Sequence, residues 1–325
     1  MKRTAAFVMA LTMGTAVLAG TAAAEPLRYE HYVALGDSYT AGPLVPWPRL
    51  DKLLCFASTN SYPAWLADSL DVGEYTDASC SSADTTNMTG PQPVPTASFA
   101  LGSAAPQFDA LTPETDLVTV GIGGNDSGVF GELVGTCPEL TAENPVGSPC
   151  RDLYTVDGVD TMKQRLTLTR ARVTEVLRGI HERSPAAKVL LVGYPRIAPP
   201  SGYCPDVLPF ADGDLRWLDS VEQALNAALA DAAAADGDTT FVDTYGPSLG
   251  HDACATGGAA WIQGKDLDLF GAAPYHPRKA GMTGVAGLIQ LELTGRSAIP
   301  GRQAPASTAT EPTADPAKVA ELLRG

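Results

Sequence analysis

The sequence predicts a three-layer α/β/α sandwich with a mainly parallel central sheet. Short apolar runs rich in β-branched residues alternate along the chain with longer segments of helical periodicity, and most of these runs end in Gly, Asp or Pro. Such runs are typical of parallel strands that helices bury on both faces. In folds of this kind the binding crevice lies at the carboxyl ends of the strands, so functional residues are sought there.

Four segments have the length and composition of buried strands. They are residues 32–35, 117–120, 189–192 and 240–242. Residues 162–180 and 215–230 place apolar side chains at i, i+3 and i+4 spacing, which predicts two amphipathic helices. Pro63 and Pro277 each stand where the first turn of a helix tolerates proline. The helices expected from them are 64–70 and 277–291.

The charge balance argues against nucleic acid as a partner. The 325 residues include 37 acidic and 22 basic side chains, for a formal net charge of -15. The resulting field repels phosphate backbones and anionic lipid surfaces. At 45% hydrophobic residues, the chain has enough apolar material for one large core or two small ones. We therefore expect a globular protein without nucleic-acid partners or integral membrane contact.

The first residues have the pattern of a secretory signal peptide. Lys2 and Arg3 form a basic start, residues 4–18 are uncharged and largely apolar, and small residues precede a cleavage point after Ala24. A membrane anchor is the alternative, but a spanning helix needs about 20 apolar residues, which exceeds this run. We expect residues 1–24 to be removed and the protein to be secreted.

The remaining chain divides into a domain and a tail. Residues 25–296 carry the strand and helix pattern, whereas residues 297–325 are rich in Pro, Ala, Ser and Thr with little periodicity. Such composition predicts a flexible C-terminal tail. We expect a single folded domain that is monomeric.

Six cysteines in an exported chain predict three disulfides, because the surroundings are oxidising. Six cysteines allow 15 pairings, and spacing does not choose among them. We expect sequential pairing, because each bridge then closes a loop between two structured segments. The pairs are Cys55 with Cys80, Cys137 with Cys150, and Cys204 with Cys254. No cysteines stand at a CxxC or CxxH spacing, so no metal site is expected.

Two segments that follow predicted strands carry residues suited to nucleophilic catalysis. Ser38 lies in residues 36–42, directly after the first strand, so its hydroxyl would face the crevice. A serine here caps a helix more often than it acts as a nucleophile, and the catalytic interpretation requires a base. Asn125 lies in the glycine-rich segment 121–126, where its amide can donate to a developing oxyanion. The alternative there is a simple Asn-Asp turn.

The chain has four histidines, so the search for a general base is short. His31 precedes the first strand, and His181 lies near a helix end among charged residues, where a solvated imidazole is expected. His251 and Asp252 are expected either to pair in support of the site or to form a loop hydrogen bond. His276, on a loop before the last helix, is the remaining candidate, and a surface loop histidine is its alternative interpretation.

Together these residues resemble the SGNH or GDSL hydrolases, and in particular their secreted bacterial esterases and lipases. The resemblance covers about residues 32–293. Its motifs are Gly-Asp-Ser-Tyr at 36–39 for the nucleophile block, Gly-Gly-Asn-Asp at 123–126 for the oxyanion block, and His-Pro at 276–277 for the base block. The resemblance implies the family's flavodoxin-like sandwich and a reaction that needs neither cofactor nor metal.

Two positions depart from the family's pattern. Its Cys-Ser-Gly-Ala run reads Cys-Ser-Ser-Ala here, with Ser82 in place of the glycine that offers a backbone N–H to the oxyanion. The family's aspartate three residues before the histidine is Ala273. The resemblance implies that the Ala273 carbonyl orients His276 instead, and Asp266 and Asp268 are rival partners.

The resemblance implies hydrolysis of carboxylic esters through an acyl-enzyme. His276 would take the Ser38 proton, and the oxyanion would be held by the N–H groups of Ser38 and Ser82 and the amide of Asn125. Simple esters, lipids, phospholipids and polysaccharide or polyester esters all remain open as substrates. The alternative from a different functional class is a secreted binding module that has lost catalysis. Ala273 and Ser82 would then be traces of that loss.

Two segments are candidates for the walls of an acyl pocket. Residues 44–47 follow the nucleophile and either line such a pocket or pack as an ordinary loop. Residues 130–152, closed by the expected Cys137–Cys150 bridge, would form another wall.

Overall fold

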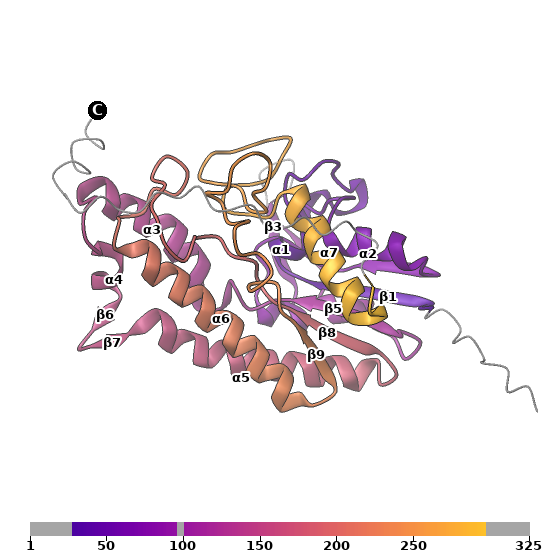
Figure 1. Cartoon of the computed structure of the whole chain (residues 1–325). Coiled ribbons are helices and arrows are strands. Elements are labelled where there is room, and N and C mark those ends of the chain that lie inside the picture. Colours follow the sequence, from indigo (N-terminus) through magenta and orange to yellow (C-terminus); the bar gives the residue numbers. More distant parts are fainter. Residues whose placement is uncertain (1–27, 96–100, 297–325) are drawn as a thin grey trace, which may run out of the picture.

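Five parallel strands form the central sheet, in the order β2-β1-β5-β8-β9 (Figure 1). They are β1 (His31–Gly36), β2 (Glu74–Asp77), β5 (Leu117–Gly121), β8 (Lys188–Val192) and β9 (Thr239–Val242). The computed structural model describes residues 28–95 and 101–296. Four of the strands are those predicted, and the predicted parallel pairing is confirmed. The edge strand β2 was missed because its Glu-Tyr-Thr-Asp sequence is too polar to read as a buried run.

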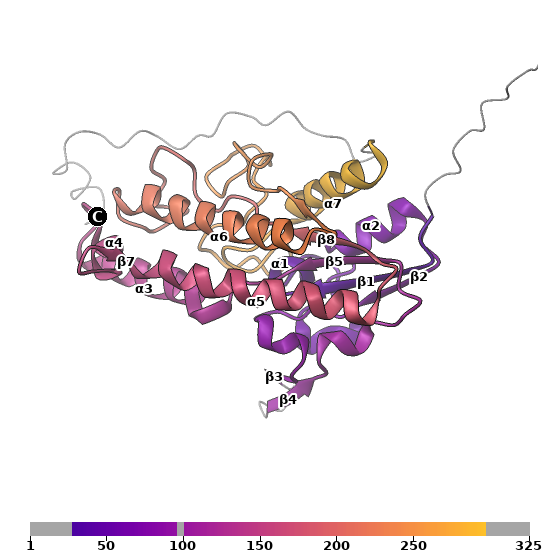
Figure 2. The same ribbon diagram turned by 90° about the horizontal axis from the view of Figure 1, so that it is seen from below.

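Helices cover both faces of this sheet, which confirms the three-layer prediction. Helices α2 (Tyr62–Leu70) and α7 (Lys279–Thr294) pack on one face, and α5 (Thr161–Arg183) and α6 (Asp214–Asp236) pack on the other. Figure 2 shows α2 and α7 on the side of the sheet opposite α5. Alternate residues of β1 point to opposite layers: Val33 and Leu35 join the core beneath α5 and α6, while Tyr32 and Ala34 join the core beneath α2 and α7.

The helices begin close to the predicted positions for local reasons, although α6 extends to Asp236, beyond its predicted end at residue 230. The Asp160 carboxylate accepts a hydrogen bond from the Lys163 N–H and caps the start of α5. Gly237, in the left-handed conformation, ends α6. Pro63 lies in the first turn of α2, as predicted, whereas α7 begins two residues after Pro277.

The remaining elements are mostly short. They are α1 (Ser38–Ala41), α3 (Val129–Glu143), α4 (Pro149–Leu153), the hairpins β3 (Gln92–Pro95) with β4 (Leu101–Ala104) and β6 (Thr155–Val156) with β7 (Val159–Asp160), and the 3-10 helices η1 (Leu50–Cys55), η2 (Thr85–Met88), η3 (Gln107–Ala110) and η4 (Asp126–Gly128). Helix α3 was not predicted, because Gly131, Gly135 and Pro138 interrupt its sequence with residues that disfavour helix.

Three disulfides join the cysteines in the sequential pairing expected from the sequence. Cys55–Cys80 links η1 to the segment after β2, Cys137–Cys150 links α3 to α4, and Cys204–Cys254 links two loops. Bridges that close loops of 13 to 50 residues stabilise the folded state by about 3–4 kcal/mol each in the chain-entropy account.

The predicted signal peptide, residues 1–24, and the predicted tail, residues 297–325, lie outside the described residues. Within the described residues, no helix has both the length and the apolar character needed to cross a bilayer.

Candidate active site

Ser38 stands at the carboxyl end of β1, as the first residue of α1. The Asp37 carboxylate caps this short helix by accepting the Tyr39 N–H at 2.8 Å. A Cβ at Gly36 would lie 2.6 Å from the Gly121 carbonyl oxygen, so only glycine lets β1 approach β5 this closely. The tight strand-to-helix turn therefore holds the Ser38 side chain, which is 5% exposed, at the mouth of the crevice.

The structure brings His276 next to Ser38, although the two are 238 residues apart in the sequence. The His276 Nε2 lies 2.9 Å from the Ser38 Oγ, within hydrogen-bonding distance. The His276 Nδ1 lies 2.7 Å from the Pro274 carbonyl oxygen. Because a carbonyl only accepts, Nδ1 carries the ring proton and Nε2 is left as the acceptor for the serine hydroxyl. This is the tautomer that a general base requires.

The carbonyl beside His276 is not the one that the sequence suggested. Ala273 was expected to orient the ring, but its carbonyl accepts the backbone N–H of His276 at 3.1 Å and closes a turn over residues 273–276. Pro274 is the second residue of that turn and Tyr275, at φ 61°, is the third, as in a type II turn. The Ala273 carbonyl is thus used in turn closure, and the Pro274 carbonyl is free to accept from the ring.

The two rival aspartates do not take that position either. The Asp268 carboxylate accepts the Phe270 N–H and lies 3.8 Å from the Arg278 guanidinium. Asp266 takes part through its backbone, where its carbonyl accepts a hydrogen bond from the Gln263 side-chain amide at 2.7 Å. The imidazole is therefore oriented by the main chain.

Aromatic rings enclose the imidazole. The Tyr39 and Phe130 ring centroids each lie 5.5 Å from that of His276, and the Tyr39 hydroxyl donates to the Tyr275 carbonyl at 2.6 Å. Removal from water lowers the pKa of the His276 imidazole below its ordinary value, and the hydrogen bond to the Pro274 carbonyl opposes this change. The ring is therefore neutral, and able to accept a proton, at neutral pH.

Asn125 follows β5 at the same edge of the sheet as Ser38, and both line one cavity. One N–H of the Asn125 amide donates to the Ala83 carbonyl at 2.9 Å, which fixes the direction of the side chain. A carboxamide has two N–H donors, so the second is available to a ligand.

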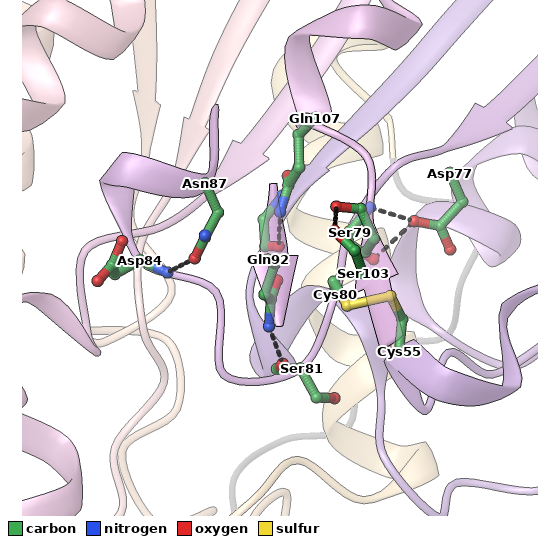
Figure 3. Close-up of a disulfide and its surroundings, with 12 residues drawn as sticks. Cys55, Asp77, Ser79, Cys80, Ser81, Asp84, Asn87, Gln92, Ser103 and Gln107 are labelled. Carbon is green, nitrogen blue, oxygen red and sulfur yellow. Dashed lines mark hydrogen bonds between the residues drawn. A yellow bond between two sulfur atoms is a disulfide. The ribbon is translucent and has the colours of Figure 1, made fainter. Parts of the chain in front are cut away.

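Ser82 has the backbone conformation that a glycine would adopt freely. Its φ is 69°, in the left-handed region, which costs a non-glycine residue about 1 kcal/mol. The backbone just before Ser82 is held in place, as Figure 3 shows: the Gln92 side chain donates to the Ser81 carbonyl at 2.7 Å, and the Cys55–Cys80 disulfide ties the segment to η1. The Ser81 N–H also donates to the Cys55 carbonyl. Ser82 does not itself line the cavity shared by Ser38 and Asn125.

A buried tyrosine joins the serine and asparagine segments, and sequence reasoning missed it. The Tyr194 hydroxyl donates to the Asp37 carboxylate at 2.5 Å and accepts the Gly124 N–H at 2.9 Å. Burial raises the pKa of the Asp37 carboxyl to about 7, and the hydrogen bond from Tyr194 opposes that rise. Tyr194 follows β8 by two residues, so its place at a strand end was the available signal.

The cavity beside Ser38 is almost entirely apolar. It measures about 760 Å³ with its open mouth included. Its apolar lining comes from α3, α6 and the loop between β8 and α6: Val129, Phe130, Leu133, Val134, Ile197, Ala198, Phe210, Leu218, Val221 and Leu225. Glu222 also lines it, with its carboxylate accepting the Ile197 N–H at 3.0 Å.

Of the two segments that the sequence suggested as walls of an acyl pocket, one lines this cavity and the other does not. Phe130 and the start of α3 form one side of the cavity, in agreement with the prediction for residues 130–152. Residues 44–47 are not part of it, since they line a different hollow together with Phe270. Val45 is buried in the core beneath α2 and α7, which is the loop-packing alternative.

The other histidines have structural contacts away from Ser38. His181 Nε2 lies 3.0 Å from the Asp236 carboxylate, and His251 Nδ1 lies 2.7 Å from the Ala259 carbonyl. His31 Nδ1 lies 3.4 Å from the Glu74 carboxylate. Across residues 28–95 and 101–296, no three His, Cys, Asp or Glu side chains are grouped as metal ligands would be.

Comparison with known proteins shows the family of this chain. The chain matches the model of the GDSL-like lipase/acylhydrolase family over residues 34–283. Lipase 2 of Streptomyces coelicolor is 37% identical over 287 residues, a match covering 86% of this chain and 92% of the lipase. An esterase of Streptomyces scabiei is 32% identical over 315 residues, covering 85% and 89%. The crystal structure of the extracellular lipase from Streptomyces rimosus superposes with a TM-score of 0.60 at 27% identity, covering 82% of this chain and 99% of that one. The chain therefore belongs to the GDSL-like lipase/acylhydrolase family and is a carboxylic ester hydrolase.

Proposed function

We propose that this protein is a secreted serine esterase or lipase that works through an acyl-enzyme on Ser38, with His276 as the general base. The observation that carries the proposal is the 2.9 Å contact between the Ser38 Oγ and the His276 Nε2, with the opposite ring nitrogen held by the Pro274 carbonyl. This is the relation between a nucleophile and an oriented base that serine hydrolysis requires.

In the first half of the reaction, His276 removes the Ser38 proton as Oγ attacks the ester carbonyl. The carbonyl oxygen becomes an oxyanion, which the second Asn125 N–H and the backbone N–H groups of Ser38 and Ser82 stabilise. The tetrahedral adduct collapses, the bond to the alcohol oxygen breaks, and the imidazolium returns its proton to that oxygen. The acyl group remains on Ser38.

In the second half, water takes the place of the alcohol. His276 removes a proton from the water as its oxygen attacks the acyl carbon, and the same donors hold the second oxyanion. The bond to Ser38 Oγ then breaks, the proton passes from the imidazolium to Oγ, and the carboxylic acid leaves. A carbonyl partner keeps the tautomer but stabilises the imidazolium less than a carboxylate would, so the proposed machinery is a dyad.

The apolar cavity beside Ser38 is the proposed site for the acyl chain. Its lining from α3 and α6 offers dispersion contact to a hydrocarbon chain and few hydrogen bonds.

Secretion is proposed from the basic and apolar pattern of residues 1–24 and from the three disulfides, which persist in oxidising compartments. We propose that the protein is a monomer.

A fluorophosphonate probe should label the wild-type protein on Ser38, because only an activated serine attacks phosphorus at a useful rate. The label should be found on the peptide that contains Ser38 by mass spectrometry, and Ser38→Ala should abolish it together with hydrolysis of short-chain p-nitrophenyl esters. A folded wild-type protein that takes up no label would favour the decayed binding module instead.

The pH profile of kcat/KM should show an acidic limb with its midpoint below about 6.5, the ordinary pKa of histidine. The neutral imidazole is the active form, and burial lowers the pKa of His276, so activity is kept to lower pH than an exposed histidine would allow. The pKa of Asp37 is raised to about 7, so Asp37→Asn serves as the control. The limb should remain in that variant, and a limb that disappears with Asp37 would contradict the assignment to His276.

A further inference from the structure

Large apolar side chains are exposed together on two loops next to the catalytic residues. Within residues 28–95 and 101–296, eight of the fourteen exposed large hydrophobic residues fall in the short segments 47–56 and 267–270. Trp47 is 69% exposed and Phe270 is 78% exposed. Such concentration is unusual for a surface that meets only water, since scattered single residues are the ordinary case.

Five of these residues surround one hollow, and we call them the apolar rim. The rim consists of Trp47, Leu53, Phe56, Leu269 and Phe270. The hollow measures about 900 Å³ with its open side included, and the rest of its lining is also apolar. The two loops are therefore parts of one contiguous patch.

Each of the two loops of the apolar rim is close in sequence to one residue of the proposed catalytic dyad. One loop follows directly from α1, which begins with Ser38, and the other runs directly into the turn that carries His276. The two are joined where the Ala273 N–H donates to the Pro43 carbonyl at 3.0 Å. A surface that covers the rim consequently lies beside the segments that hold both proposed catalytic groups.

We propose that the apolar rim docks this protein onto the surface of aggregated neutral or zwitterionic lipid, so that ester molecules reach Ser38 directly from the aggregate. The choice of occupant rests on the proposed function, because esters with long acyl chains are poorly soluble and collect in aggregates. The net charge of -15 disfavours an anionic surface. Aromatic and leucine side chains gain most at an uncharged lipid interface.

The test measures binding separately from catalysis. The secreted protein carrying Ser38→Ala is mixed with phosphatidylcholine vesicles and sedimented, and Trp47 fluorescence is recorded with brominated phosphatidylcholine as the quencher. We expect co-sedimentation and strong quenching that is lost in Trp47→Phe, since Trp47 is the most exposed of the four tryptophans. Binding should weaken when half of the phosphatidylcholine is replaced by phosphatidylglycerol.

The double variant Phe56→Asn with Phe270→Ser should reduce partition to phosphatidylcholine by at least about tenfold. Phe56 has φ 53°, a conformation that asparagine tolerates, so the fold should be retained. The matched control is Leu153→Ser with Leu168→Ser, two residues of comparable exposure on α4 and α5, which should leave partition unchanged. Thermal unfolding of both variants checks that they are folded.

Activity provides the second readout, measured in protein that retains Ser38. The rim variant should hydrolyse a soluble short-chain ester within about twofold of wild type and lose at least about tenfold on emulsified triglyceride. The proposal is overturned if wild type does not bind the vesicles, if the rim variant binds as well as the control, or if the rim instead joins two copies, seen as a dimer that only the rim variant dissociates. Failure of fluorophosphonate labelling would contradict the proposed function but not the docking proposal, because vesicle binding is measured in a protein that lacks Ser38.

Discussion

Replacing His276 by alanine should lower kcat for a short-chain p-nitrophenyl ester by about 10⁴-fold or more, the scale seen when a nucleophile loses its base. The physical reason is that Ser38 then has no acceptor for its proton, since Nε2 of the ring is the group at 2.9 Å from Oγ. Because the two residues act as one unit, the double variant Ser38→Ala with His276→Ala should be no slower than either single variant. Single-turnover and steady-state rates of all three proteins test this.

His31→Asn is the matched control for the loss of a histidine. His31 begins β1 and contacts Glu74, so its replacement should leave kcat within about twofold of wild type. Multiplicative losses in the double variant, or a His276→Ala enzyme that retains a tenth of the activity, would contradict the dyad.

Replacing Asn125 by alanine should lower kcat by about 10²–10³-fold with little change in KM, as expected for a donor that acts chiefly on the oxyanion. The amide is well placed for this role because one N–H is anchored on the Ala83 carbonyl and the other is left for the substrate. Asn125→Asp should be at least as damaging, because a carboxylate offers no donor and repels the developing charge.

The control for this prediction is Asn144→Ala, at the exposed end of α3. It should leave both constants near those of wild type. A fall in kcat of less than tenfold in Asn125→Ala would remove the asparagine from the proposed oxyanion hole and leave the backbone donors alone. Circular dichroism of the variants excludes loss of fold as the cause.

Because residue 273 is alanine and not aspartate, His276 has no carboxylate partner at that position. With no carboxylate three residues before the histidine, the ring is held by the Pro274 carbonyl and enclosed by Tyr39 and Phe130. The main chain therefore supplies orientation, and in the proposed mechanism the imidazolium is stabilised less than it would be beside a carboxylate.

Much of the fold was predictable because it depends on local pattern. The strands β1, β5 and β8 are largely apolar runs that are buried on both faces, β9 is a shorter run rich in β-branched residues, and α5 and α6 show clear helical periodicity. Helix α3 was not predictable, since its glycines and Pro138 oppose helix formation and packing against the rest of the core overrides them. The edge strand β2 escaped notice because its Glu-Tyr-Thr-Asp sequence contains no apolar run.

The sequence by itself determined four of the five sheet strands, their parallel sense and the placement of Ser38, Asn125 and His276 where function is sought, because strand pattern and residue type are properties of short segments. Only the tertiary structure decided which carbonyl meets the imidazole, which helices line the cavity beside Ser38, and that side chains from segments 47–56 and 267–270 meet in one apolar rim. Each of these depends on the path of a turn or on contact between segments far apart in the chain, and such contacts leave no periodic trace in the sequence.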